Sequence, residues 1–248
     1  MARPKSTRSR GPGLRLDWIE VALLCAVYVL VVLLWDTVWV YPLKLVVVYL
    51  HEIGHGLAAL ATGGRVLEIQ LHQGEGGHCV TVGGNGFLIY SAGYLGSLAF
   101  GVTLLLVSTR APRATGAAAL ALGLLLAGTA LWLVPLADNA FGKLFGVLVG
   151  ALVAALAIAP PVWAAVMLRV VAVTSCLYAI LDIKSDVLDR PGVRSDAVEL
   201  AEVTHVPAVV WGILWIVVSI VVTGLAARRA VAAKPRADRV DSPARAGR

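Results

Sequence analysis

Hydrophobic residues occur along most of this chain in long uncharged runs, separated from one another by short polar or charged stretches. Runs of this length without charge are typical of helices that cross a membrane. Proline cannot continue a helix, so the Pro160-Pro161 pair divides one long run into two helices. The pattern predicts about six or seven transmembrane helices, over residues 21–35, 42–63, 87–108, 114–137, 144–158, 161–181 (or as far as 188) and 206–227.

One segment departs from this helical pattern. Within residues 65–82, the apolar Leu67, Ile69 and Leu71 alternate with polar residues, and the glycine-rich stretch 74–77 interrupts the alternation before it resumes. Alternation with a period of two is typical of a β-strand, and glycine is typical of a turn. We therefore predict an all-α polytopic membrane protein with one small β-hairpin, which directly follows the second helix.

Composition and charge agree with a membrane protein. Hydrophobic residues make up 59% of the 248 residues, charged residues only 15%, and the mean hydropathy is +0.84, which excludes disordered, collagen-like and disulfide-stapled chains. Twelve of the 21 Lys and Arg residues lie in two terminal tails. Basic tails beside apolar spans are typical of contact with anionic lipid, and without interleaved aromatic residues they do not predict nucleic-acid binding.

These features predict three regions: a basic cytosolic tail over 1–16, an integral membrane domain over 17–227 and a basic, disordered tail over 228–248. The expected location is the cell membrane, with the N-terminus in the cytosol. Seven full spans would place the two tails on opposite sides of the membrane, although both favour the cytosol. Either one segment is re-entrant or the C-terminal tail breaks the positive-inside rule.

The second predicted helix carries charge in its middle. His51, Glu52 and His55 form an H-E-x-x-H motif with apolar residues on both sides. Ionisable residues at such depth are rare without a function, at a cost of about 2.5 to 3.5 kcal/mol for each central charge. Two histidines four residues apart share one helix face and can bind one zinc ion, while the glutamate between them is placed as a general base. The motif therefore predicts one zinc ion per chain.

A catalytic zinc site needs a third protein ligand. His72 and His78 on the hairpin are candidates, although solvation is the commoner state of an exposed histidine. Asp182 is the preferred candidate, because its depth in the membrane would be similar to that of His55. Asp182 would lie about 9 Å inside the end of its helix, and His55 about 12 Å inside the end of its own. In the seven-span scheme both helices end at the cytosolic face. Asp186, one turn later, is the alternative ligand.

The chain resembles the site-2 protease group of intramembrane zinc metallopeptidases, in its compact branch without PDZ domains. Four features carry this resemblance: the H-E-I-G-H helix, the glycine-rich hairpin, a small-residue helix at 91–97 and a later Leu-Asp pair at 181–182. The resemblance covers about 42–97 and 178–186. It implies that His51, His55 and Asp182 are zinc ligands.

The same resemblance implies that Glu52 is the catalytic base. The segment 91–97, Ser-Ala-Gly-Tyr-Leu-Gly-Ser, is similar to the family's A-G-P-x-x-N helix. Gly93 matches the glycine of that motif and Ser97 stands where asparagine is usual, so both are candidate substrate-binding residues. Tyr94 replaces the family's proline, and Ile183 replaces the glycine that usually follows the Leu-Asp pair.

The expected activity is hydrolysis of a peptide bond in or near a transmembrane segment, so the expected partners are a membrane protein or peptide substrate and the lipid bilayer. The hairpin would either pair with an unwound substrate strand or seal the site. A non-proteolytic zinc-binding scaffold is the first alternative function. A transporter is a weaker one, because the chain shows no inverted repeat.

Overall fold

The computed structural model describes residues 16–189 and 194–233, and most of the predicted tails, 1–15 and 234–248, lies outside this part of the chain. Within it the fold is helical with one hairpin, as predicted. The helices are α1 (Trp18–Leu33), α2 (Tyr41–Ala61), α3 (Gly86–Arg110), α4 (Thr115–Leu133), α5 (Ala140–Ala155), α6 (Pro161–Lys184), α7 (Asp196–Thr204) and α8 (Ala208–Val231).

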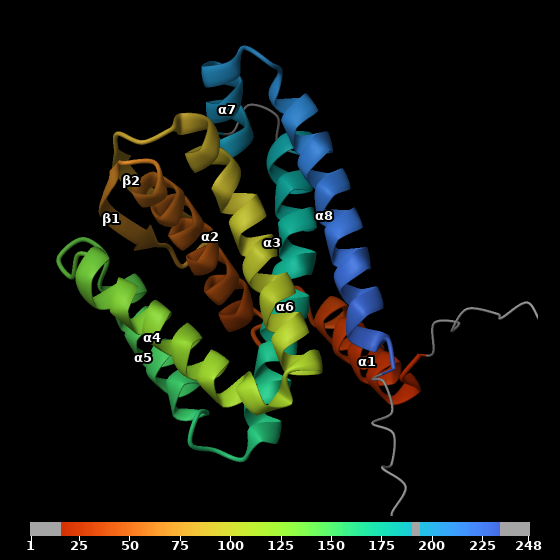
Figure 1. Cartoon of the computed structure of the whole chain (residues 1–248). Helices are drawn as coiled ribbons and strands as arrows, with labels where there is room; N and C mark the ends of the chain where they lie inside the picture. Colours follow the sequence, from red (N-terminus) through yellow and green to blue (C-terminus); the bar gives the residue numbers. More distant parts are fainter. Residues whose placement is uncertain (1–15, 190–193, 234–248) are drawn as a thin grey trace, which may run out of the picture.

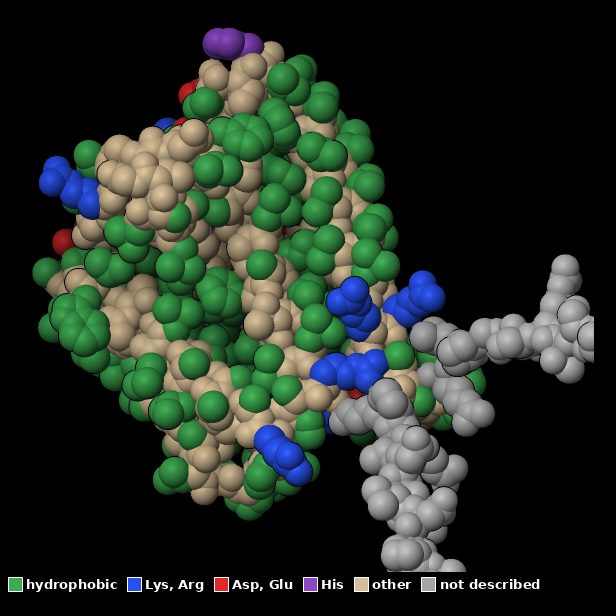
Figure 2. All heavy atoms as spheres, viewed as in Figure 1, with side chains coloured by type: hydrophobic (Ala, Val, Ile, Leu, Met, Phe, Trp, Pro, Cys, Tyr) green, Lys and Arg blue, Asp and Glu red, His purple; other side chains and the backbone are tan. Residues whose placement is uncertain are grey.

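Five helices of the described chain are long and apolar enough to cross a membrane: α2, α3, α4 with the turn before it, α6 and α8. The two other apolar helices, α1 and α5, have 16 residues each. The fold is therefore an all-α polytopic membrane protein. Figure 1 shows α3, α6 and α8 side by side, and in Figure 2 hydrophobic side chains are spread over the whole visible face.

Small residues allow the helices to approach closely. A Cβ atom added to Gly54 of α2 would collide with the carbonyl oxygen of Ala92 on α3, and one added to Gly96 would lie 3.1 Å from the Cα of Gly54. In the α4–α5 pair, a Cβ on Gly150 would lie 2.6 Å from the backbone nitrogen of Ala127. Close packing of this kind drives helix association in lipid, where no hydrophobic effect acts between helices. It fixes α2 against α3.

The predicted hairpin is confirmed. Strands β1 (Arg65–Leu71) and β2 (Gly77–Val82) pair in antiparallel register, with an irregularity near Val66. The hairpin runs back along α2, because the hydroxyl of Tyr41 in the first turn of α2 donates to the carbonyl of Gln73 at 2.8 Å. Nearby, Lys44 pairs with Glu75 at 3.1 Å. These contacts hold the hairpin turn against the first part of α2.

The two ends of the described chain lie together. Leu16 forms an isolated bridge with Ala232, and the backbone N–H of Asp17 donates to the carbonyl of Val231 at 2.8 Å. The sequence left two alternatives open, a re-entrant segment or a C-terminal tail that breaks the positive-inside rule, and this contact favours the first. Helix α1 is a candidate for the re-entrant segment, because it has only 16 residues and starts beside the end of α8.

A difference concerns the polar segment between the last two predicted spans, for which the sequence pattern predicted no helix. It contains α7, which packs across the end of the bundle between α3 and α8 (Figure 1). Ala197 and Leu200 of α7 are fully buried in a cluster with Tyr94, Ile183 and Trp215. This short helix brings a carboxylate to the H-E-x-x-H motif.

Candidate metal centre

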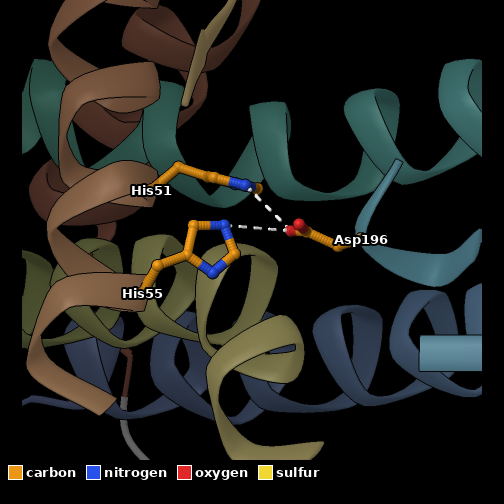
Figure 3. Close-up of side chains that lie close together, drawn as sticks. All are labelled: His51, His55 and Asp196. Atoms are coloured by element: carbon orange, nitrogen blue, oxygen red, sulfur yellow. Dashed lines mark ion pairs between the residues drawn. The ribbon is translucent and has the colours of Figure 1, made fainter. Parts of the chain in front are cut away.

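His51 and His55 lie one turn apart on α2, with ring centroids 4.8 Å apart and planes at 76°. Their side chains are 13% and 8% exposed, so both are largely shielded from solvent. Because residues four apart share a helix face, both rings point to the same side of α2. Figure 3 shows the two rings directed toward a single carboxylate.

That carboxylate belongs to Asp196, the first residue of α7. Its Oδ2 atom lies 3.0 Å from Nε2 of His51 and 3.3 Å from Nε2 of His55. One potential ligand atom from each of the three residues lies within 4.8 Å of the others. Two nitrogens and one oxygen therefore converge on one point between α2 and α7.

Hydrogen bonds and packing orient the two rings. Nδ1 of His55 donates to the backbone carbonyl of Ile89 at 2.7 Å, which turns Nε2 toward the centre. The ring of Tyr94 packs edge-on against His51, with centroids 5.0 Å apart. The hydroxyl of Tyr94 in turn donates to Asp186 at 2.7 Å. These contacts come from α3 and the end of α6.

The residues present fit a zinc ion. Two imidazole nitrogens and one carboxylate oxygen form a known donor set for catalytic zinc, and bonds of about 2.0 to 2.2 Å to a shared ion separate neighbouring ligand atoms by about 3.3 Å. The Oδ2 atom of Asp196 is buried and accepts no hydrogen bond within the described residues. Burial alone would raise the pKa of Asp196, but the neighbouring His55 and His51 hold that pKa below its usual range.

The space beside these ligands depends on Gly93. A Cβ atom added there would lie 2.5 Å from Oδ2 of Asp196 and closer still to Nε2 of His51. Any larger residue at this position would occupy the point where the ligand atoms converge. The glycine that the sequence motif marked therefore leaves room for an ion.

Glu52 is 4% exposed and lines the same cavity, which has a volume of about 740 Å³. The first residue of β2 lies over its carboxylate, because a Cβ on Gly77 would be 2.8 Å from Oε1 of Glu52. Cys79, also on β2, lies near the same group: burial, and next the negative charge of Glu52, raise the pKa of its thiol to about 12. The hairpin therefore forms the wall beside Glu52.

The structure brings Asp196 to the two histidines in place of the predicted Asp182 and its alternative Asp186. Asp182 lines the same cavity from α6 but is not part of the converging group of described residues. Asp186 lies in a π-helical turn at Ser185–Asp189 and accepts the hydrogen bond from Tyr94. The depth argument considered only spanning helices, and α7 does not span.

Three other candidates are not part of the converging group. Ser97 is buried between α3 and α6, where its hydroxyl donates to the carbonyl of Tyr94 at 2.9 Å and its own carbonyl accepts from Ser175 at 2.7 Å. A substrate contact by Ser97 therefore has no support, because its polar groups bond inside the bundle. His72 and His78 form an exposed pair with Nε2 and Nδ1 3.3 Å apart, outside the converging group.

Asp196 was absent from the sequence-based candidates, yet its segment carries a helix signal. Ser195 is a favourable N-cap residue, acidic residues occupy the first turn, and Ala197, Leu200 and Ala201 recur at helical spacing. A nine-residue amphipathic helix was therefore predictable. Its contact with α2 was not, because it depends on how the chain folds back after α6.

Comparison with known protein families identifies a relationship. The family model described as Peptidase M50B-like matches residues 23–226, most of the chain and the whole H-E-x-x-H helix. No curated protein and no solved structure matches this chain.

Proposed function

Because this chain belongs to the Peptidase M50B-like family, we propose that it is an intramembrane zinc metallopeptidase that hydrolyses a peptide bond in or near a transmembrane segment of another membrane protein. The observation that carries the proposal is the convergence of His51, His55 and Asp196 beside Glu52, in a cavity between apolar helices. This arrangement combines three ligand atoms, an adjacent general base and a location at membrane depth.

In this proposal His51, His55 and Asp196 hold one zinc ion, with Asp196 in place of Asp182. When bound, the ion supplies a Lewis acid that polarises the peptide carbonyl and makes water more acidic. Glu52 accepts a proton from the water that attacks the carbonyl carbon, and donates this proton to the amine nitrogen as the carbon–nitrogen bond breaks. Its burial keeps the carboxylate close to the reacting atoms and away from bulk water.

The hairpin is proposed to position the substrate. A helical segment hides its peptide bonds in internal hydrogen bonds, so it must unwind locally before hydrolysis. Residues His78, Cys79, Val80 and Thr81 of β2 line the cavity, whereas β1 contributes no residue to this lining. An unwound segment could therefore add to the edge of β2, as extended peptides add to the edges of other sheets.

The proposed activity is tested by Glu52→Gln in purified protein reconstituted with a model transmembrane substrate. The variant keeps all three ligands, so we expect zinc near one ion per chain by elemental analysis, as in the wild type, and loss of cleavage. A wild type that binds zinc but cleaves none of a panel of transmembrane peptides, with a cellular phenotype unaffected by Glu52→Gln, would instead favour a non-proteolytic zinc-binding scaffold.

The role of β2 is tested by photo-cross-linking. A photoreactive residue in place of Val80 on β2 is expected to capture the substrate, whereas the same residue in place of Leu67 on β1 is not. Both side chains are exposed, Val80 at 36% and Leu67 at 52%, so accessibility alone does not favour Val80. Equal capture at both positions would contradict pairing at the β2 edge and favour a hairpin that only seals the site.

A further inference from the structure

The bundle has two distinct ends. The tail end is defined here by Leu16, Arg110, Arg113 and Ala232: Leu16 pairs with Ala232, and Nε of Arg110 at the end of α3 donates to the carbonyl of Arg229 at 2.7 Å. Arg113 lies in the short turn that follows α3. In Figure 2, cations gather near this end of α8.

The site end is opposite, at the far ends of α3 and α8. The backbone N–H of Asn85, which caps the start of α3, donates to the hydroxyl of Thr62 at the end of α2 at 2.9 Å. The Phe87 ring in the first turn of α3 packs on Trp211 in the first turn of α8, with centroids 5.5 Å apart. Because α7 joins the start of α8, the centre built by α2 and α7 belongs to this end.

The residues of the metal centre lie between the site end and the middle of the bundle. His55 is six residues from the end of α2, about 9 Å, and His51 is ten residues from it, about 15 Å. Gly93, which adjoins both His51 and Asp196, is seven residues from the start of α3, about 10 Å. In a hydrocarbon core about 30 Å thick, the centre lies in the half of the membrane at the site end.

Charge distinguishes the two ends. Arg110 and Arg113 lie at the end of α3 and in the turn after it, five cations precede Leu16 in the sequence, and seven follow from Arg228 onward. Fourteen of the 21 Lys and Arg residues therefore lie at the tail end or in the sequence that continues from it. Of the described cations, four belong to the opposite side: Arg65, Lys143, Lys184 and Arg194. Lys and Arg within about 15 to 20 residues of the spans favour the cytosol, whereas acidic residues contribute little.

We infer that the tail end faces the cytosol and that the metal centre lies in the extracytoplasmic half of the membrane. The sequence-based scheme, in which α2 ended at the cytosolic face, is thereby inverted. For the proposed peptidase, the substrate class is then a transmembrane segment cut near its extracytoplasmic end. This second step rests on the proposed function, but the orientation of the chain does not.

The orientation is tested by cysteine labelling. In a background with Cys25, Cys79 and Cys176 replaced by alanine, one variant carries Glu202→Cys on α7 and a matched variant carries Arg113→Cys in the turn after α3. Both native side chains are exposed, and neither is part of the metal centre. A membrane-impermeant maleimide is expected to label Glu202→Cys in intact spheroplasts, and Arg113→Cys only after the membrane is permeabilised.

The reverse pattern would overturn the inference, and so would labelling of both variants to the same extent before permeabilisation. Zinc content of the cysteine-free background, compared with that of the wild type, checks that its fold is preserved. Labelling does not depend on catalysis. If the orientation holds but Glu52→Gln has no effect on cleavage, the proposed peptidase function fails and the topology stands. If labelling is reversed but Glu52→Gln abolishes cleavage, the proposed peptidase function stands and the topology fails.

Discussion

Helices α2 and α7 supply the same centre from very different surroundings. In α2, 72% of the most apolar window is buried inside the protein, against 17% in the lipid-facing α8. Helix α7 has nine residues, lies across the end of the bundle and buries only Ala197 and Leu200 among its apolar residues. A deeply packed span thus carries the two proposed histidine ligands and the proposed base, and a short peripheral helix carries the proposed third ligand.

The difference has a physical consequence for the site. The two histidines are fixed by the close contact of Gly54 with α3 and by the hydrogen bond from His55 to Ile89. The position of Asp196 depends on the small cluster in which Ala197 and Leu200 of α7 are buried. Elements with few buried apolar contacts open at lower free energy than the core. We therefore expect α2 to define the position of the centre and α7 to complete it.

The largest expected effect is loss of a ligand from α2. Replacement of His51 by alanine removes one of two imidazoles on a rigid helix, and should weaken zinc binding by more than the roughly 10- to 100-fold that loss of an outer-shell partner costs. Asp196→Ala should also weaken binding strongly, but by less than His51→Ala, because α7 can shift and let water replace the carboxylate. Competition with a chelator of known affinity measures both.

The matched control for Asp196→Ala is Asp182→Ala, which removes a carboxylate from the same cavity without removing a converging ligand atom. Zinc affinity within about threefold of the wild type is expected for this control, a change of about 0.7 kcal/mol. Strong loss of zinc in Asp182→Ala together with normal binding in Asp196→Ala would reverse the assignment and restore the sequence-based ligand.

A smaller but still large effect is expected for Gly93→Ala. The added methyl group would lie within 2.5 Å of Asp196 Oδ2 and against Nε2 of His51, so it would separate the ligands that α2 and α7 supply. We expect zinc affinity to fall about tenfold or more, comparable to loss of an outer-shell partner. Helicity by circular dichroism should stay unchanged, because alanine favours a helix by about 1 kcal/mol over glycine.

Gly128→Ala is the control for this substitution. Gly128 lies in α4, where an added Cβ would meet only the ring of Trp132 at an ordinary distance of 3.5 Å. Zinc content should equal that of the wild type. A comparable loss of zinc in both variants would show that a general effect on folding, and not the space beside the ligands, explains Gly93→Ala.

Much of the fold was predictable from the sequence, since long uncharged runs, the Pro160-Pro161 break and the alternation at 65–82 each have a direct structural cause. His51, Glu52 and His55 were also identifiable, because ionisable residues in an apolar helix are costly. Asp196 was not identifiable in this way, because an aspartate in a polar segment carries no such energetic cost. The relative placement of the two tails was left open for a similar reason: only the contact of Leu16 with Ala232 shows that the described chain begins and ends at one place.

The smallest effect is expected for Tyr94→Phe, which tests the connection between the two helices. Tyr94 packs its ring against His51 of α2 and belongs to the cluster that buries Ala197 and Leu200 of α7. Phenylalanine keeps both contacts but loses the hydrogen bond to Asp186, which should lower the free energy of unfolding by about 1.5 to 3 kcal/mol.

Zinc affinity should change by less than about threefold in Tyr94→Phe, because the ring that orients His51 remains. Tyr94→Leu removes this ring and should weaken zinc binding by about tenfold, as expected for loss of a partner that orients a ligand. Chelator competition and thermal unfolding of the two variants separate the roles of the ring and the hydroxyl. Equal zinc affinities in Phe and Leu variants would mean that the ring does not orient His51, and that α2 positions this ligand without help from α3.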